Sequence, residues 1–302
     1  MVYVLFMVCN LSEVDKQSFS ATIDNIVTLL MTKVDANKAA IKEEVSQVLS
    51  FLMDKAVIRK IKTDNGTEVY EFYTEEESKV AQIIKNQKVD NNTYTEELYK
   101  IISDHFSFSA STNKETFITR SFNIGGNVDG RNILSNNPDV VVDFLTTAST
   151  DSPEQYAFTN QPNHLAFFLF PLFKNNAELR QNFLEYCRVQ CFAQEQAISE
   201  ERQRTKRIFS DRAKELYKNE IKPQFQQMLD ACPVISGQNI LSPSVLGSAK
   251  NKERYKAALT NHLKNLYDSA HLVNGSEYPK SQSELSDKIL RPVEATLVDL
   301  PL

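Results

Sequence analysis

The clearest pattern of apolar and polar positions lies between residues 20 and 73, where two amphipathic segments precede two short β-rich segments. In residues 22–34 the apolar side chains return every three or four positions, which is one face of an α-helix. These positions are Ile23, Ile26, Val27, Leu30 and Val34. Either Thr22 or Ser20 can cap the start of this helix with its hydroxyl group.

A second helix is predicted over residues 36–53, which are rich in helix-forming side chains. Asp35 stands directly before this segment and is suited to be its N-cap. The apolar stripe that we expect the helix to bury consists of Ile41, Val45, Val48, Leu52 and Ala56.

Two short strands are predicted at residues 57–62 and 68–73, which are rich in β-branched and aromatic side chains. Asn65-Gly66 between them supplies the positive φ that a tight hairpin turn needs. Thr74 followed by Glu77 has the spacing of a capping box. This spacing predicts that another helix begins where the hairpin ends.

The order of two helices and a hairpin is that of a winged helix-turn-helix domain, which we place at residues 1–88. Such domains commonly lay their second helix in the DNA major groove and set the hairpin, or wing, against the DNA backbone. The basic side chains that this arrangement would bring toward DNA are Lys38, Lys42, Arg59, Lys60 and Lys62. Contacts from these side chains to phosphates would give affinity without a preference for sequence.

A purely structural role for the winged helix stays open as the alternative. Glu43 and Glu44 stand beside Lys42, and residues 1–88 hold slightly more acidic than basic side chains. The basic surface that DNA binding requires is therefore thin. In this alternative the winged helix is a packing unit of a protein–protein interaction module.

Residues 89–174 are predicted to form a small α+β domain. After a helix at about 94–104, apolar and polar residues alternate at 106–109 and again at 117–124, as in strands with one buried face. In the second of these segments, the side chains expected to share a face are Ile118, Phe122 and Ile124.

Two solid apolar runs of strand length follow, at 140–145 and 165–170, and Pro171 ends the second run. Gly125-Gly126 and Asp129-Gly130 predict turns. Together these segments predict a sheet of about three to five mostly antiparallel strands.

A long helical region is expected over residues 175–275, with a linker or truncated tail at 276–302. Within this region 176–222 is predicted as one long helix that is stopped or kinked at Pro223. Its middle, 195–207, is almost wholly polar and is expected to project from the domain.

The polar middle of this helix carries the basic side chains Arg202, Arg204, Lys206 and Arg207. They form either a solvated helix face with ion pairs one turn apart or a contact for phosphates or an acidic partner. Farther along the chain, 253–272 predicts another amphipathic helix.

Composition and motifs give no support for an enzyme, which stays a distant third interpretation. The net charge is −5 and the chain has only 7 glycines, so close approaches of backbone to a nucleotide are few. The glycine-containing segment 125–131 lacks the Gly-Lys-Ser/Thr of a phosphate loop. Cys187 and Cys191 are one helical turn apart, but two further metal ligands are missing nearby. We therefore assign no catalytic, cofactor-binding or metal-binding residue.

No membrane contact is expected from the sequence. The early apolar run 2–9 is far shorter than the roughly 20 residues that a bilayer-spanning helix needs, and it lacks the features of a signal peptide. We expect it to be a buried helix, and its position directly after Met1 suggests that the chain is part of a longer protein. The absence of required disulfides fits a cytoplasmic location.

Four stretches of the chain carry a resemblance to a known family. They are residues 11–15 (LSEVD) with 20–26 (SATIDNI), residues 70–77 (YEFYTEEE), the strand pattern at 106–108 leading into 117–122 (FITRSF), and residues 195–220 with their SEERQR run. Together these stretches resemble the region downstream of the P-loop domain in the large ATPase of bacteriophage-exclusion (BREX) defence systems. The Walker motifs of that family have no counterpart here, so no residue of an ATP site is carried over.

The resemblance implies a non-catalytic part of a cytoplasmic, prokaryotic antiphage ATPase, which works with other defence proteins on duplex DNA. In this interpretation the winged helix and the basic helix contribute DNA or protein contacts. The predicted fold class is α+β, with an N-terminal winged helix, a central small and mostly antiparallel sheet, and long C-terminal helices.

Overall fold

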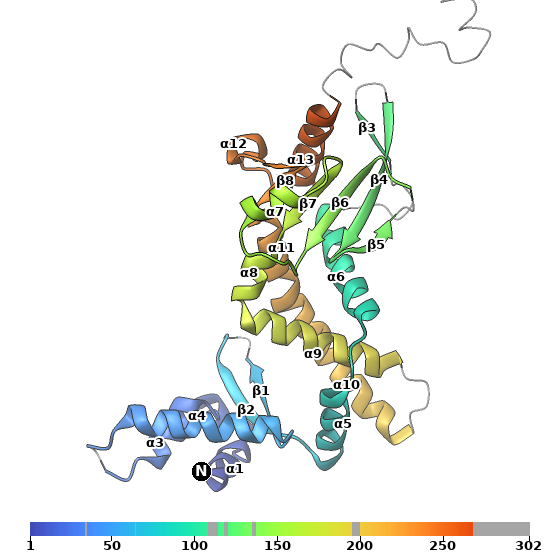
Figure 1. Ribbon diagram of the computed structural model, residues 1–302. Coiled ribbons are helices and arrows are strands. Elements are labelled where there is room, and N and C mark those ends of the chain that lie inside the picture. Colours follow the sequence, from blue (N-terminus) through green and yellow to red (C-terminus); the bar gives the residue numbers. More distant parts are fainter. Residues whose placement is uncertain are drawn as a thin grey trace, which may run out of the picture. The chain divides into compact units, whose positions relative to one another are not determined.

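The computed structural model describes residues 1–33, 35–63, 65–107, 114–117, 120–134, 137–194 and 200–267. These residues form an α+β protein with long helices in its C-terminal part, as predicted (Figure 1). The chain divides into two compact units: unit 1 contains Met1–Val89 with Leu184–Leu216, and unit 2 contains Asp90–Phe183 with the chain from Tyr217 onward. Within the described ranges, every helix is too short or too polar to cross a membrane.

Some sequence predictions fall outside the described residues. They concern Val34, Ile118, the pair Phe108-Ser109 and the tail at 276–302.

Unit 1 begins with four helices, a β-hairpin and a further helix. The elements are α1 (Val2–Cys9), α2 (Glu13–Ser18), α3 (Ile23–Leu30), α4 (Lys38–Asp54), β1 (Ile58–Lys62), β2 (Glu68–Phe72) and α5 (Glu75–Asn86). The core among them is built from Leu5, Ile26, Val27, Val45, Leu49 and Ile58. Two elements from later in the chain, the second half of α9 (Ala177–Gln194) and α10 (Glu200–Leu216), complete the unit.

Side-chain hydrogen bonds to backbone N–H groups mark where α3 and α4 begin. The Thr22 hydroxyl accepts a hydrogen bond from the Asn25 N–H at 3.2 Å and caps α3, as predicted. The prediction that Asp35 caps the next helix was wrong, because the Asn37 side chain accepts from the N–H groups of Ala39 and Ala40. α4 therefore begins two residues later than expected.

Two expectations about buried faces were wrong. In α4 Val48 is 37% exposed and Leu49 is 1% exposed, because Val45, Leu49 and Leu52 follow the helical period on the side that faces α3. In α1 only Leu5 and Val8 are buried, so this helix is not buried all round.

The hairpin and the start of α5 match the sequence predictions. β1 pairs antiparallel with β2, with Ile58 opposite Phe72, and Gly66 in the turn has a φ of 76°. The Thr74 hydroxyl and the Glu77 carboxylate each accept a hydrogen bond from the other residue's backbone N–H. The capping box at Thr74 is thereby confirmed.

Unit 2 contains a mixed sheet. Its strands are β3 (Lys114–Phe117), β4 (Arg120–Val128), β5 (Arg131–Leu134), β6 (Val140–Leu145), β7 (His164–Phe168), β8 (Val234–Ser236) and β9 (Asn239–Ile240). The order is β3-β4-β6-β7-β8-β9, and β5 pairs with β4. Among the described strands four pairings are antiparallel, whereas β4–β6 and β6–β7 are parallel.

Helices cover both faces of this sheet (Figure 1). The helices of the unit are α6 (Asn91–Phe106), α7 (Pro153–Thr159), α8 (Phe170–Asn175), α11 (Lys222–Ala231), α12 (Pro243–Leu246) and α13 (Asn251–Leu266), with the first part of α9. Phe106 of α6 and Tyr255 of α13 lie against Phe167 on one face. Tyr156 of α7 lies against Phe168 on the other face, since successive strand residues point in opposite directions.

Two predictions in the sheet region were wrong. Phe106 is the last residue of α6 rather than part of a strand, and Ser107 ends that helix in the left-handed conformation with a φ of 55°. Gly125-Gly126 lies inside β4 rather than in a turn. A Cβ atom on Gly125 would come within 2.7 Å of the Pro138 side chain, so glycine is required there by close packing.

The prediction of one long helix over 176–222 was also wrong. Asn182 donates a hydrogen bond to Glu220 at 3.2 Å, and Asn176 donates one to Gln224 at 2.8 Å. In a continuous helix, residues 182 and 220 would lie about 57 Å apart, at 1.5 Å per residue. The chain therefore reverses between α9 and α10, and residues 195–199 lie outside the described ranges.

Of the two alternatives at Pro223, a stop or a kink, the stop was wrong, and an irregular turn is found just before the proline. α10 continues through a π-helical turn, η1 (Tyr217–Ile221), and Pro223 lies in the first turn of α11. Proline has no N–H group to donate to the preceding turn, and the departure from α-helical geometry lies in that turn, at η1.

The end of the polar middle is packed, which the sequence did not predict for Thr205, and the residues after it continue the same buried face. Thr205, Phe209 and Ala213 are buried, at a spacing of four residues that puts them on one face of the helix. The Phe209 ring stacks on Tyr73 with 5.9 Å between centroids, and α10 lies against α5 within unit 1.

Candidate functional site

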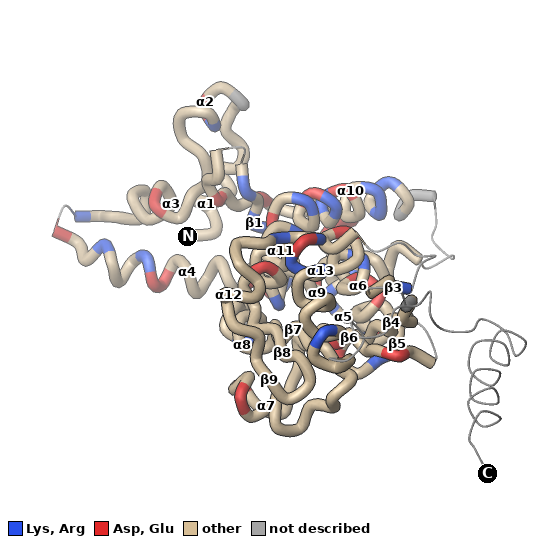
Figure 2. Tube along the Cα trace, turned by 90° about the horizontal axis from the view of Figure 1, so that it is seen from above, with Lys and Arg blue, Asp and Glu red and all other residues tan. Residues whose placement is uncertain are grey.

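The basic side chains that the sequence singled out in the N-terminal region are largely paired with acidic side chains. The Lys42 ammonium group lies 2.8 Å from the Asp24 carboxylate, and that of Lys60 lies 2.9 Å from Glu68. Lys38 is exposed at the start of α4, and Lys62 is exposed at the end of β1. Figure 2 shows basic and acidic positions following one another along α4.

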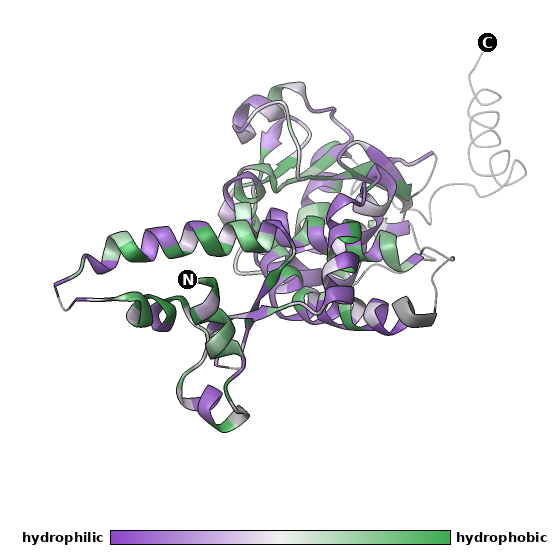
Figure 3. Ribbon diagram, turned by 90° about the horizontal axis from the view of Figure 1, so that it is seen from below, coloured by the Kyte–Doolittle hydropathy of each residue, from purple (hydrophilic) through white to green (hydrophobic). Residues whose placement is uncertain are grey.

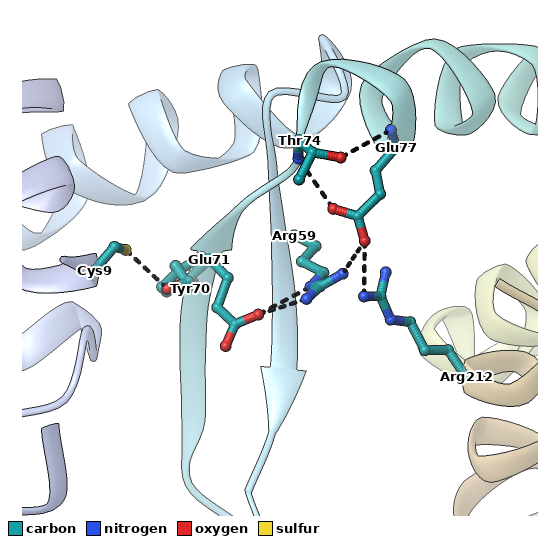
Figure 4. A network of polar contacts seen from close by, with 7 residues as sticks. All are labelled: Cys9, Arg59, Tyr70, Glu71, Thr74, Glu77 and Arg212. Atoms are coloured by element: carbon teal, nitrogen blue, oxygen red, sulfur yellow. Dashed lines mark hydrogen bonds and ion pairs between the residues drawn. The ribbon is translucent and has the colours of Figure 1, made fainter. Parts of the chain in front are cut away.

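Arg59 lies at the centre of a network of charged groups (Figure 4). Its guanidinium group donates to Glu71 of the neighbouring strand at 2.6 Å and to Glu77 of α5 at 3.2 Å. Arg212 of α10 donates to the same oxygen of Glu77 at 2.9 Å. One carboxylate thereby connects the hairpin, α5 and α10.

The Glu77 carboxylate is held in its charged form. Its second oxygen accepts the Thr74 N–H at 3.0 Å. Burial raises the pKa of Glu77, but the Thr74 N–H and the guanidinium groups of Arg212 and Arg59 lower it more strongly, so its pKa lies below the ordinary value. The network is therefore a structural clamp, and Arg59 is not presented to solvent as a free phosphate contact.

A pH-dependent stability follows from this clamp. Because the folded-state pKa of Glu77 is lowered, its stabilisation is fully present above the ordinary value of 4.5 and is lost as the pH falls through the lower folded-state pKa. We expect Glu77→Gln to destabilise the protein at about pH 7 and to differ less from the wild type at about pH 3. Thermal unfolding of both proteins at the two pH values measures this, and a difference independent of pH would contradict it.

The basic side chains of α10 are arranged differently. Arg204 and Arg207 are exposed and Lys206 is partly buried, while the side chain of Arg202 lies outside the described part of the structure. Arg212, which lies nearer the C-terminal end of α10, donates a hydrogen bond to Glu77 instead. Several basic positions lie along α10 in Figure 2.

Apolar side chains are exposed on the N-terminal helices. On α1 Tyr3 is 85% and Met7 is 69% exposed, with Phe6 also largely exposed, and most of the helix next to the N label has the hydrophobic colour in Figure 3. On α4 Phe51 is exposed beside Val48. The outward face of α4 thus presents apolar and acidic side chains along with its lysines.

The four cysteines are free thiols, and they are not grouped as metal ligands. Cys187 is buried and Cys191 is half-buried on α9, and the Cys9 thiol donates to the Tyr70 carbonyl at 3.2 Å. Among the described residues, no group of three or more His, Cys, Asp or Glu side chains is placed to hold a metal ion.

The ion pair between Glu77 and Arg212 was not predicted from the sequence. Glu77 was recognisable as a capping residue, but its contact with Arg212 spans 135 positions in the chain. Such a contact has no local signal in the sequence.

Comparison with known proteins identifies the family. Residues 87–244 match the family model described as the fourth domain, with a six-stranded β-sheet, of the BREX ATP-binding protein BrxC. The matched range contains all of β3 to β9, and the strand path β3-β4-β6-β7-β8-β9 has six members among the described strands. No solved structure matches the chain. The chain therefore belongs to the BrxC family of BREX defence ATPases and contains its fourth domain.

Proposed function

We propose that this chain is a non-catalytic accessory region of a BREX ATPase whose N-terminal unit, a winged helix, contacts other proteins of the defence system. One observation carries the proposal. The basic side chains expected to meet DNA phosphates are largely paired with acids of their own unit, whereas apolar side chains of α1 and α4 face solvent.

The interpretation of unit 1 as a winged helix rests on its order of elements and one backbone hydrogen bond. α3, α4 and the β1–β2 hairpin follow one another directly. The Tyr70 N–H in β2 donates to the Ala21 carbonyl at 3.0 Å, so the residues before α3 add to the hairpin in the manner of a short third strand.

Protein contact is favoured over DNA contact by the surface of α4. In DNA-binding winged helices the second helix enters the major groove, where acidic side chains are repelled by phosphates. Here that helix exposes Glu43 and Glu44, and its Lys42 is already paired with Asp24. Exposed Phe51 and Val48 instead suit a protein partner, since aromatic side chains are enriched in protein interfaces.

The exposed face of α1 supports the same conclusion. Val2–Cys9 contains no charged residue, and contiguous apolar surface of this kind is typical of interaction sites. A partner that covers Tyr3 and Met7 would remove apolar area from water at little cost in desolvation of charges.

The test is direct binding between the purified chain and purified proteins of the same defence system. We expect the double variant Tyr3→Glu/Met7→Glu to bind its partner at least about tenfold more weakly, which corresponds to about 1.4 kcal/mol. Because both side chains are highly exposed, the variant should fold normally. The control Gln181→Glu/Thr260→Glu adds the same charge at exposed positions elsewhere and should bind like the wild type.

DNA contact through α10 is the second candidate, because Arg204 and Arg207 are exposed. Fluorescence anisotropy with a labelled duplex distinguishes the two functions. Binding that falls steeply with salt and is lost in Arg204→Glu/Arg207→Glu would support this candidate. Loss in Lys60→Glu/Lys62→Glu would instead assign the contact to the wing and overturn the preference for protein contact.

A further inference from the structure

One segment of unit 2 is unusual in having no charge. Residues 231–249 contain no Asp, Glu, Lys or Arg, although 24% of the chain is charged. The segment includes β8, β9 and α12. Its residues from 238 to 240 and from 242 to 245 are exposed, so the absence of charge is a property of the surface and not only of the core.

Within this segment β9 forms an edge of the sheet. Its Ile240 lies opposite Ile235 and its Asn239 lies opposite Ser236 of β8, and β9 is the last strand in the sheet order among the described strands. The Leu241 N–H donates to the Val234 carbonyl at 2.8 Å. Since backbone groups of successive strand residues point to opposite sides, the N–H and carbonyl of Ile240 point away from β8.

The helix next to this edge carries an exposed aromatic side chain. α7 packs against β8 and β9, and its C-cap Asn160 donates to the Gly237 carbonyl in the β8–β9 turn at 2.8 Å. On α7, Ala157 is buried and Tyr156 lies against Phe168, but Phe158 is 82% exposed. Ile240 on β9 is 39% exposed.

We propose that the surface formed by Phe158 and the edge of β9 binds an extended, uncharged segment of a partner protein. The partner's backbone pairs with the outward groups of Ile240, and one of its apolar side chains lies against Phe158. This is the strand-addition mode of peptide recognition, in which main-chain hydrogen bonds provide affinity and neighbouring side chains provide selectivity.

The absence of charge on this surface is the reason for proposing an uncharged partner segment. Edge strands are commonly protected from pairing by charged side chains, especially lysine, and residues 231–249 contain none. A nucleic acid would require basic side chains, and a charged peptide would require an opposite charge. In α7 the only charged side chain is Glu154, at the far end of the helix from Phe158.

The surface is in unit 2 and is independent of the α1 contact proposed above. A display library of random ten-residue peptides, selected against the whole chain, tests it. We expect the enriched peptides to be uncharged and rich in β-branched and aromatic residues, and we expect their binding to slow hydrogen exchange at the Ile240 amide.

The binding of the enriched peptides is then measured with two variants of the proposed surface and one control variant. Phe158→Asp and Ile240→Lys should each weaken binding at least about tenfold. Val14→Asp, which changes a 75% exposed apolar side chain in unit 1, should leave it unchanged. Circular dichroism equal to that of the wild type shows that each variant is folded. Failure to enrich any peptide, enrichment of charged peptides, or unchanged binding in Phe158→Asp would overturn the proposal.

Discussion

Replacing Glu77 by alanine is expected to lower the local free energy of unfolding in unit 1 by about 3 kcal/mol. The change removes the carboxylate that Arg59 and Arg212 share, and it leaves two partly buried guanidinium groups without this partner. It also removes the acceptor for the Thr74 N–H and so breaks the capping box. Loss of a helix cap alone costs about 1 kcal/mol.

Native-state hydrogen exchange at the amides of β1, β2 and α5 measures this effect, because it reports the stability of the unit itself. Glu75→Ala is the matched control in the same helical turn. The Glu75 side chain is 84% exposed and pairs with Lys79, so its removal should leave the free energy of unfolding nearly unchanged. Equal effects at the two positions would show that the Glu77 network does not hold the unit together.

Glu77→Gln separates the two roles of this side chain. The amide keeps an acceptor for the Thr74 N–H but carries no charge for Arg59 and Arg212. We expect its effect to lie between those of Glu75→Ala and Glu77→Ala. A cost equal to that of alanine would assign the whole effect to charge, and no cost would assign it to the cap.

The local elements of unit 1 were predictable because their signals are short in range. The Thr22 cap, the hairpin around Gly66 and the capping box at Thr74 each depend on residues within a few positions of one another. The pairing of charges was not predictable in the same way. Lys42 and Asp24 are 18 positions apart, and a count of acids and bases does not say which of them meet.

The sheet was predicted in outline, and its central pairings were missed. The solid apolar runs that became β6 and β7 are typical of strands buried on both faces, which is the pattern of parallel strands. The reversal between α9 and α10 lacked the usual glycine or proline signal, and both flanking segments are rich in helix-forming residues. Contacts such as Asn182 with Glu220 make the reversal evident only in three dimensions.

Replacing Phe106 by alanine is expected to have the largest effect in unit 2. The ring is 1% exposed and lies 5.1 Å from Phe167, 5.5 Å from Tyr255 and 6.0 Å from Phe144, centroid to centroid. It thus connects α6 and α13 to the two central strands of the sheet. Truncating a buried phenylalanine costs about 3–5 kcal/mol, through lost transfer energy and the cavity that remains.

Phe158→Ala is the matched control, because it removes the same ring from a position that is 82% exposed. It should change the local stability by less than about 0.5 kcal/mol. Phe106→Leu fills most of the volume and should cost about 1.5 kcal/mol, which keeps the prediction measurable if the alanine variant does not fold. Hydrogen exchange at the amides of β6 and β7 is the measurement. Since Phe106 touches both central strands, their protection should fall together, and a loss confined to α6 would mean that the ring stabilises only the end of its own helix.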